Sequence, residues 1–136
     1  MKRGARSLLA TLLTVLVVGV AVEARADMME KLAGTNPKER AGIQTAFMKS
    51  KLGLPEAELA KVAAINLEYA EKAEPVIKGS DGPFMKMRQM KEIQGQKDTA
   101  LQGVLTPAQY QAYQAARDEM KQKFEEAIEK KAAGGS

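Results

Sequence analysis

Hydrophobic positions between residues 36 and 131 recur at helical spacing and predict about four α-helices. The first helix is expected to begin after Asn36, which can cap it and is followed by a proline suited to the first turn, and to end near Gly53. The second is expected to begin near Pro55 and to kink or end just before Pro75, because an internal proline removes a backbone donor. The pattern therefore predicts an all-α fold.

Turn-forming residues over 78–83 predict the loop of a helical hairpin. The third helix is expected over 84–103, with Lys97 interrupting its apolar stripe. A fourth helix is expected from 107 to 131, with aromatic and other apolar side chains in heptad positions: Tyr110, Tyr113, Met120, Phe124 and Ala127. Such narrow stripes, surrounded by charged side chains, indicate elongated, curved helical hairpins or a dimer that shares its core.

The first 26 residues have the pattern of a cleaved secretory signal peptide. Three basic residues, Lys2, Arg3 and Arg6, precede an apolar run over 8–22, and Ala24-Arg25-Ala26 offers a small-x-small cleavage site. No cysteine follows the run, so a lipobox-type lipid anchor is not expected. We therefore expect export to the periplasm, with no stable membrane insertion after cleavage.

The expected organisation after the signal peptide is a flexible arm (27–35), one helical domain (36–131) and a disordered tail (132–136). The signal segment holds four of the 21 basic and one of the 17 acidic residues, which leaves 17 basic and 16 acidic residues in the exported part. Nucleic-acid binding normally requires a strongly basic face, so this balance argues against a nucleic-acid partner.

The chain contains no cysteine and no histidine. Serine or cysteine catalytic triads and the usual zinc sites therefore cannot be built. The acidic residues lie in Lys-rich helical contexts typical of a solvated surface. We expect no catalytic residue, no metal and no cofactor.

Leu105, Thr106, Pro107, Gln109 and Tyr110 form a motif with a clear physical meaning. The hydroxyl of Thr106 and the side chain of Gln109 can satisfy each other's backbone amides in a capping box, with Pro107 at the first helical position. Leu105 and Tyr110 are placed to form a hydrophobic staple. We expect this motif to fix the angle at which the chain enters the last helix.

A second, degenerate copy of the motif lies about 50 residues earlier, where Leu54, Pro55 and Glu58 take the corresponding places. Together with the signal peptide, the helical layout and a Met-containing third helix, the two copies resemble the periplasmic LTxxQ-motif family of Spy/CpxP-like proteins. The resemblance covers about residues 40–124. It implies a cradle-shaped antiparallel homodimer without a cofactor, and either chaperone activity or a role in envelope-stress or metal sensing.

The leading functional expectation is an ATP-independent periplasmic chaperone (holdase) that binds unfolded proteins. Its candidate client-binding residues combine apolar and basic side chains at the start of the third helix: Phe84, Met85, Lys86, Met87, Arg88 and Met90. Phe84, Met87 and Met90 also fit the inward stripe of that helix, whereas Met85 does not.

Two alternatives remain open at this stage. The exported protein could dock on the periplasmic domain of a sensor kinase and modulate it. The methionines of the third helix could instead bind Cu(I) or Ag(I), which thioethers select. Because Met85 and Met87 point about 200 degrees apart on a helix, such a site would need Met28, Met29, Met48 or a dimer mate.

Overall fold

The protein is described here by a computed structural model, which places residues 27–134, and no strand occurs within that range. A short helical segment at 27–33 precedes five longer elements: α2 (Pro37–Leu52), α3 (Glu56–Lys78), α4 (Pro83–Gln102), α5 (Pro107–Ala115) and α6 (Arg117–Ala132). The predicted all-α class is confirmed. Within 27–134, none of the helices is long and apolar enough to cross a membrane. The predicted signal peptide and residues 135–136 lie outside the described residues.

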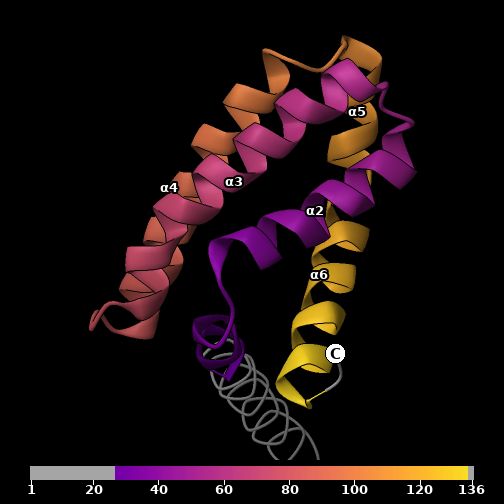
Figure 1. The fold of residues 1–136 in the computed structure, drawn as a ribbon. Coiled ribbons are helices and arrows are strands. Elements are labelled where there is room, and N and C mark those ends of the chain that lie inside the picture. Colours follow the sequence, from indigo (N-terminus) through magenta and orange to yellow (C-terminus); the bar gives the residue numbers. More distant parts are fainter. Residues whose placement is uncertain (1–26, 135–136) are drawn as a thin grey trace, which may run out of the picture.

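The helices form an arch (Figure 1). The α3–α4 hairpin makes one limb, α6 makes the other, and α5 lies where the two limbs meet. α2 runs between the limbs and contacts α3, α5 and α6. The predicted hairpin around the 78–83 loop is confirmed by the packing of α3 on α4.

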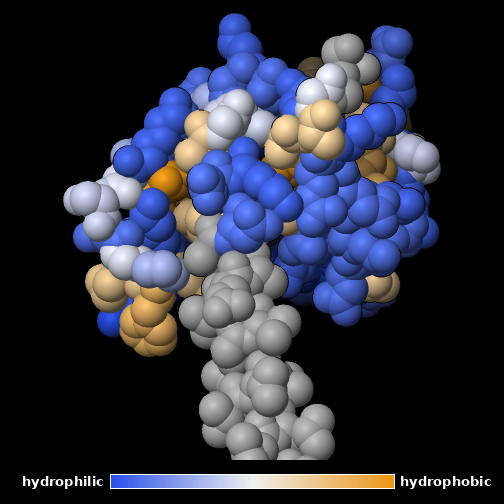
Figure 2. Space-filling model, turned by 90° about the horizontal axis from the view of Figure 1, so that it is seen from below, coloured by the Kyte–Doolittle hydropathy of each residue, from blue (hydrophilic) through white to orange (hydrophobic). Residues whose placement is uncertain are grey.

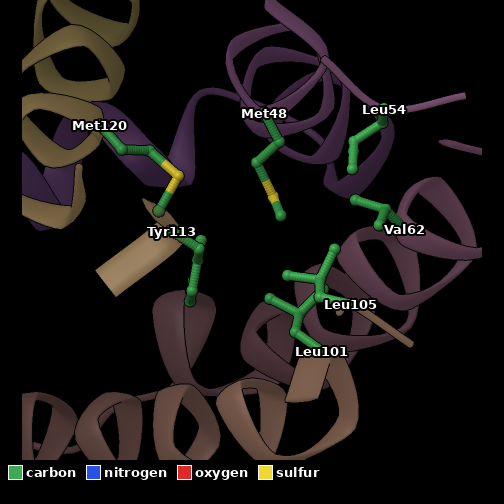
Figure 3. Packing of buried hydrophobic residues seen from close by; sticks show 7 residues of the cluster. All are labelled: Met48, Leu54, Val62, Leu101, Leu105, Tyr113 and Met120. Carbon is green, nitrogen blue, oxygen red and sulfur yellow. The ribbon is translucent and has the colours of Figure 1, made fainter. Parts of the chain in front are cut away.

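The larger hydrophobic core holds the closed end of the arch together (Figure 3). This apex cluster gathers buried residues from the five helices α2 to α6 and from two of the loops between them: Met48, Leu54, Val62, Leu101, Leu105, Tyr113 and Met120. Each fully buried side chain of this size contributes about 1.5–3 kcal/mol. The apex cluster is therefore the main source of stability for the fold.

A smaller core lies nearer the open end of the arch. This open-end cluster consists of Leu32, Ala73, Ile77 and Ile128. Several half-buried residues pack against it: Met28, Met29, Ile43, Met90, Ile93 and Phe124. It joins the two limbs at a point that the apex cluster does not reach.

Local capping explains where α2 begins and ends. Asn36 Oδ1 accepts a hydrogen bond from the Glu39 amide (2.9 Å), and Glu39 Oε2 accepts one from the Asn36 amide (3.1 Å). The helix stops at Gly53, which adopts the left-handed conformation at φ 58°. Both expected boundaries of this helix are confirmed.

Residues 27–33, expected to belong to a flexible arm, are instead helical in the structure. Leu32 is buried in the open-end cluster, and the buried guanidinium of Arg40 donates to the carbonyl oxygens of Leu32 (3.3 Å) and Thr35 (2.9 Å). The other end of the Arg40 guanidinium pairs with Glu74 of α3. These contacts between distant residues order a segment whose own sequence shows no helical period.

Of the two outcomes expected at Pro75, a kink or an end of the helix, the end does not occur, and the expected fourth helix is not continuous. α3 continues past Pro75 to Lys78, since Pro75 is exposed and only its own amide donor is lost so near the end of the helix. The expected fourth helix is divided at Ala116 into α5 and α6. Ala116 has ψ near 1°, far from the helical value, and its small side chain is buried at the bend.

Candidate functional site

An apolar surface lies at the start of α4, where the α3–α4 hairpin turns. Phe84 is 73% exposed, Met85 43% and Met87 41%, and these are the exposed large hydrophobic residues of 27–134. Arg88 is exposed beside them. Phe84, Met85, Met87 and Arg88 are called the hairpin patch below. Viewed from below the arch, hydrophobic side chains reach the surface on the side where the hairpin turns (Figure 2).

The hairpin patch is exposed because α4 begins beyond the reach of the core. Ile77, close to the end of α3, is the last residue of that helix in the open-end cluster. Phe84 and Met87 follow the turn and have no cluster to pack against, so the expectation that they form an inward stripe is wrong for both residues. It is correct for Met90, which packs against the open-end cluster. The exposure expected for Met85 is confirmed.

Lys86 has a structural role at this turn. Its ammonium donates a hydrogen bond to the Ile77 carbonyl oxygen (2.9 Å), near the C-terminus of α3, where the helix dipole favours a cation. Gln89 donates to Asp81 Oδ2 (3.2 Å) in the same turn. Of the six candidate client-binding residues, four are therefore exposed within the first two turns of α4, while Lys86 bonds to the end of α3 and Met90 packs against the open-end cluster.

The capping box at Thr106 is confirmed. Thr106 Oγ1 accepts from the Gln109 amide (3.2 Å), and Gln109 Oε1 accepts from the Thr106 amide (2.8 Å). Leu105 is buried in the apex cluster and Tyr110 packs against it, as the hydrophobic staple predicts. Pro107 occupies the first turn of α5.

The two copies of the motif contact each other, which the sequence did not predict. Gln109 Nε2 donates a hydrogen bond to Glu58 Oε2 (2.8 Å) across the closed end of the arch. Pro55 makes no side-chain capping bond, as its lack of a hydroxyl requires, while Leu54 is buried in the apex cluster. Glu58 therefore accepts a hydrogen bond from the intact motif instead of capping the helix that its own copy of the motif begins.

A polar network missed by sequence reasoning joins α4 to α5 and α6. Asp98 Oδ1 accepts from the Tyr113 hydroxyl (2.8 Å) and from Gln94 Nε2 (2.9 Å), and Asp98 Oδ2 pairs with Arg117. Burial, followed by the hydrogen bond to Asp98, raises the pKa of Tyr113 above its ordinary value. The hydroxyl consequently remains a donor over the physiological pH range.

The methionines considered for a thioether site are spread over the molecule, with Met85 and Met87 exposed in the hairpin patch and the others in or against the two cores. Met48 is buried in the apex cluster, whereas Met28, Met29 and Met90 pack against the open-end cluster. Within the part of the chain that the structure describes, no group of three or more acidic side chains could hold a metal ion.

Comparison with known proteins places the chain in a family without assigning an activity. No curated protein matches it, and no solved structure does. Residues 23–113 match a family model described as a domain of unknown function, DUF4890. This stretch is more than half of the chain and includes both α2–α3 and α3–α4 connections as well as the intact motif. The protein therefore belongs to the DUF4890 family.

Proposed function

We propose that the protein is an ATP-independent periplasmic holdase that binds unfolded proteins through the hairpin patch. The single observation that carries this proposal is the exposure of Phe84, Met85 and Met87 within about one turn at the start of α4, at one end of the molecule. Contiguous exposed hydrophobic side chains are uncommon on soluble monomers and typically mark an interaction surface.

The chemistry of the hairpin patch suits weak and adaptable contacts. Methionine side chains are flexible and polarisable, so they can adjust to different apolar segments of a client. Arg88 adds a cation that attracts acidic segments. The turn that presents the patch is held in place by the hydrogen bond from Lys86 to Ile77, so the patch is supported by a rigid hairpin.

The likeness to the LTxxQ-motif family supports the same function. The intact motif forms its capping box, and its Gln109 binds Glu58 of the degenerate copy, so the two corners act as one brace at the closed end of the arch. We include in the proposal the homodimer that this likeness implies. Sedimentation of the purified protein at several concentrations tests it, and a monomer throughout would contradict it.

The chaperone proposal is tested by light scattering of heat-unfolded citrate synthase, with and without the purified protein and without ATP. The wild type should suppress aggregation, and Phe84→Ser combined with Met85→Gln and Met87→Gln should abolish most of the suppression. The matched control is Ala108→Ser combined with Ala112→Gln, two exposed positions on α5, which should retain it. Equal suppression by both variants would exclude the hairpin patch, and no suppression by the wild type would exclude a holdase.

The proposed periplasmic location rests on the N-terminal sequence pattern. Cell fractionation followed by intact mass measurement tests it. The expected mass corresponds to a chain that begins at Asp27, and recovery of the uncleaved chain from the cytoplasm would contradict the proposal.

A further inference from the structure

A cavity of about 330 Å³ lies between the two limbs of the arch, lined mostly by residues of and around the open-end cluster and reaching Met120 of the apex cluster. This volume is within the range of small-molecule sites. Most of its wall is apolar and comes from the N-terminal segment and from α3, α4 and α6, with Leu32, Ala73, Ile77, Met90, Ile93 and Phe124 among the lining residues. The wall therefore favours a hydrocarbon group.

Lys97 provides a buried cation in the same cavity. Its side chain lines the cavity although the residue is only 4% exposed. Its ammonium donates to Gln44 Oε1, a neutral acceptor, and no carboxylate of residues 27–134 lies within the 4.0 Å of an ion pair. The carboxylate of Asp98 favours the charged form of Lys97 but is paired with Arg117, and burying an ammonium without an ion-pair partner of its own is costly. An anion bound in the cavity would remove that cost.

The other charged groups of the wall leave Lys97 as the natural site for an anion. Arg40 is paired with Glu74, and Arg117 is paired with Asp98. Asp118 and Lys121, both exposed on α6, also line the cavity and have opposite charges. The wall thus presents one buried positive charge without a carboxylate partner, surrounded by apolar side chains.

Lys97 lies on the same face of α4 as two of the apolar residues that line the cavity. Met90, Ile93 and Lys97 follow one another at spacings of three and four residues, so they lie along one face of the helix. A linear molecule with its charged end at Lys97 can extend its chain along Ile93 and Met90 toward the open end of the arch. The cavity contains the apolar residues that such a chain would contact.

We propose that this cavity binds a single-chain amphiphile with one carboxylate, that is, a free medium-chain fatty acid, whose carboxylate pairs with Lys97. Phe84, Met85 and Met87 are not among the lining residues, so the cavity is distinct from the hairpin patch. Fatty-acid binding and client binding can therefore fail independently.

The test is calorimetric titration of the purified protein with decanoate below its micellar concentration. One decanoate should bind per chain, while decyltrimethylammonium, which has the same chain length and the opposite charge, should bind at least about tenfold more weakly. Lys97→Met should weaken decanoate binding by about tenfold or more, because a charge-assisted hydrogen bond is lost. Lys91→Met, the same change at an exposed position of α4, should alter it by less than about twofold.

A second variant tests the apolar part of the site without changing Lys97. Ala70 of α3 lines the cavity, and Ala70→Met should fill part of it and weaken decanoate binding while the fold is retained. The proposal is overturned if decanoate does not bind, if Lys97→Met binds it as tightly as the wild type, or if both amphiphiles bind equally. Binding only to phosphatidylglycerol vesicles, with no uptake of free decanoate, would also overturn it.

Discussion

Thr106 illustrates how one side chain can secure a helix entry. Its hydroxyl accepts from the Gln109 amide, which otherwise lacks an intrahelical partner at the first turn of α5. We predict that Thr106→Ala lowers the free energy of unfolding by about 1 kcal/mol. Chemical denaturation measures the change, with Gln111→Ala at an exposed position of the same helix as control. An unchanged midpoint for Thr106→Ala would contradict the capping role.

Lys97 makes the opposite contribution, because its buried charge opposes folding. Burial lowers its pKa from 10.5 to about 8, Asp98 raises it and Arg117 lowers it further. The same cavity is also lined by other polar or charged side chains: Arg40, Gln44, Tyr69, Gln94, Arg117, Asp118 and Lys121. The unfolded chain therefore retains this proton between about pH 8 and pH 10.5 while the folded chain releases it.

The burial of Lys97 leads to a prediction for how the free energy of unfolding depends on pH. Below about pH 8 the full cost of burying the protonated Lys97 side chain opposes folding, and this cost should disappear as the pH rises toward 10.5. The free energy of unfolding should therefore increase by up to about 3 kcal/mol over this pH range because of this group. Lys97→Met should be more stable than the wild type at pH 7, and the difference should shrink with rising pH. Denaturation of both proteins at several pH values measures it. A difference that stays constant with pH would refute the assignment.

At the scale of helices, Asp98 connects three consecutive elements, α4, α5 and α6. Since Tyr113 and Arg117 both bind Asp98, the bend at Ala116 places residues on either side of it against α4. We predict that Asp98→Ala and Tyr113→Phe are coupled by about 1 kcal/mol or more in a double-mutant cycle of unfolding free energies. Asp98→Ala and Glu71→Ala, at an exposed position of α3, should instead be additive. Additivity of the first pair would exclude the network.

The elements that could be predicted are those specified by nearby residues. The caps at Asn36 and Thr106 depend on partners three positions away, and the 78–83 loop depends on its own turn formers. The helicity of 27–33 and the bend at Ala116 depend instead on contacts with distant residues, above all those of Arg40 and Asp98. A single sequence read for periodicity does not contain these contacts.

The candidate sites show the same division. Periodicity predicts that α4 is amphipathic but does not show where its packing partner ends, so it leaves Phe84 and Met87 compatible both with an inward stripe and with an exposed surface. Lys97 was treated as an interruption of the apolar stripe, because lysine is usually exposed. Its burial between the limbs depends on how α2, α4 and α6 meet, and only the three-dimensional arrangement reveals it.

At the scale of the whole molecule, the two hydrophobic clusters should differ in stability. The apex cluster contains seven buried residues and the open-end cluster four, one of them contributed by the short N-terminal segment. Proteins commonly open locally where few apolar contacts hold a segment. The open end of the arch should therefore open more readily than the closed end.

Arg40 controls that opening, since it joins the N-terminal segment to α3 through Leu32, Thr35 and Glu74. We predict that Arg40→Gln speeds amide hydrogen exchange in residues 27–35 by about tenfold or more, because charge-assisted hydrogen bonds are lost. Exchange near Val62 and Leu101 in the apex cluster should change much less, and Lys38→Gln, at an exposed position of α2, should change neither. Equal acceleration in both clusters would mean that the arch unfolds as one cooperative unit and that Arg40 stabilises the whole of it.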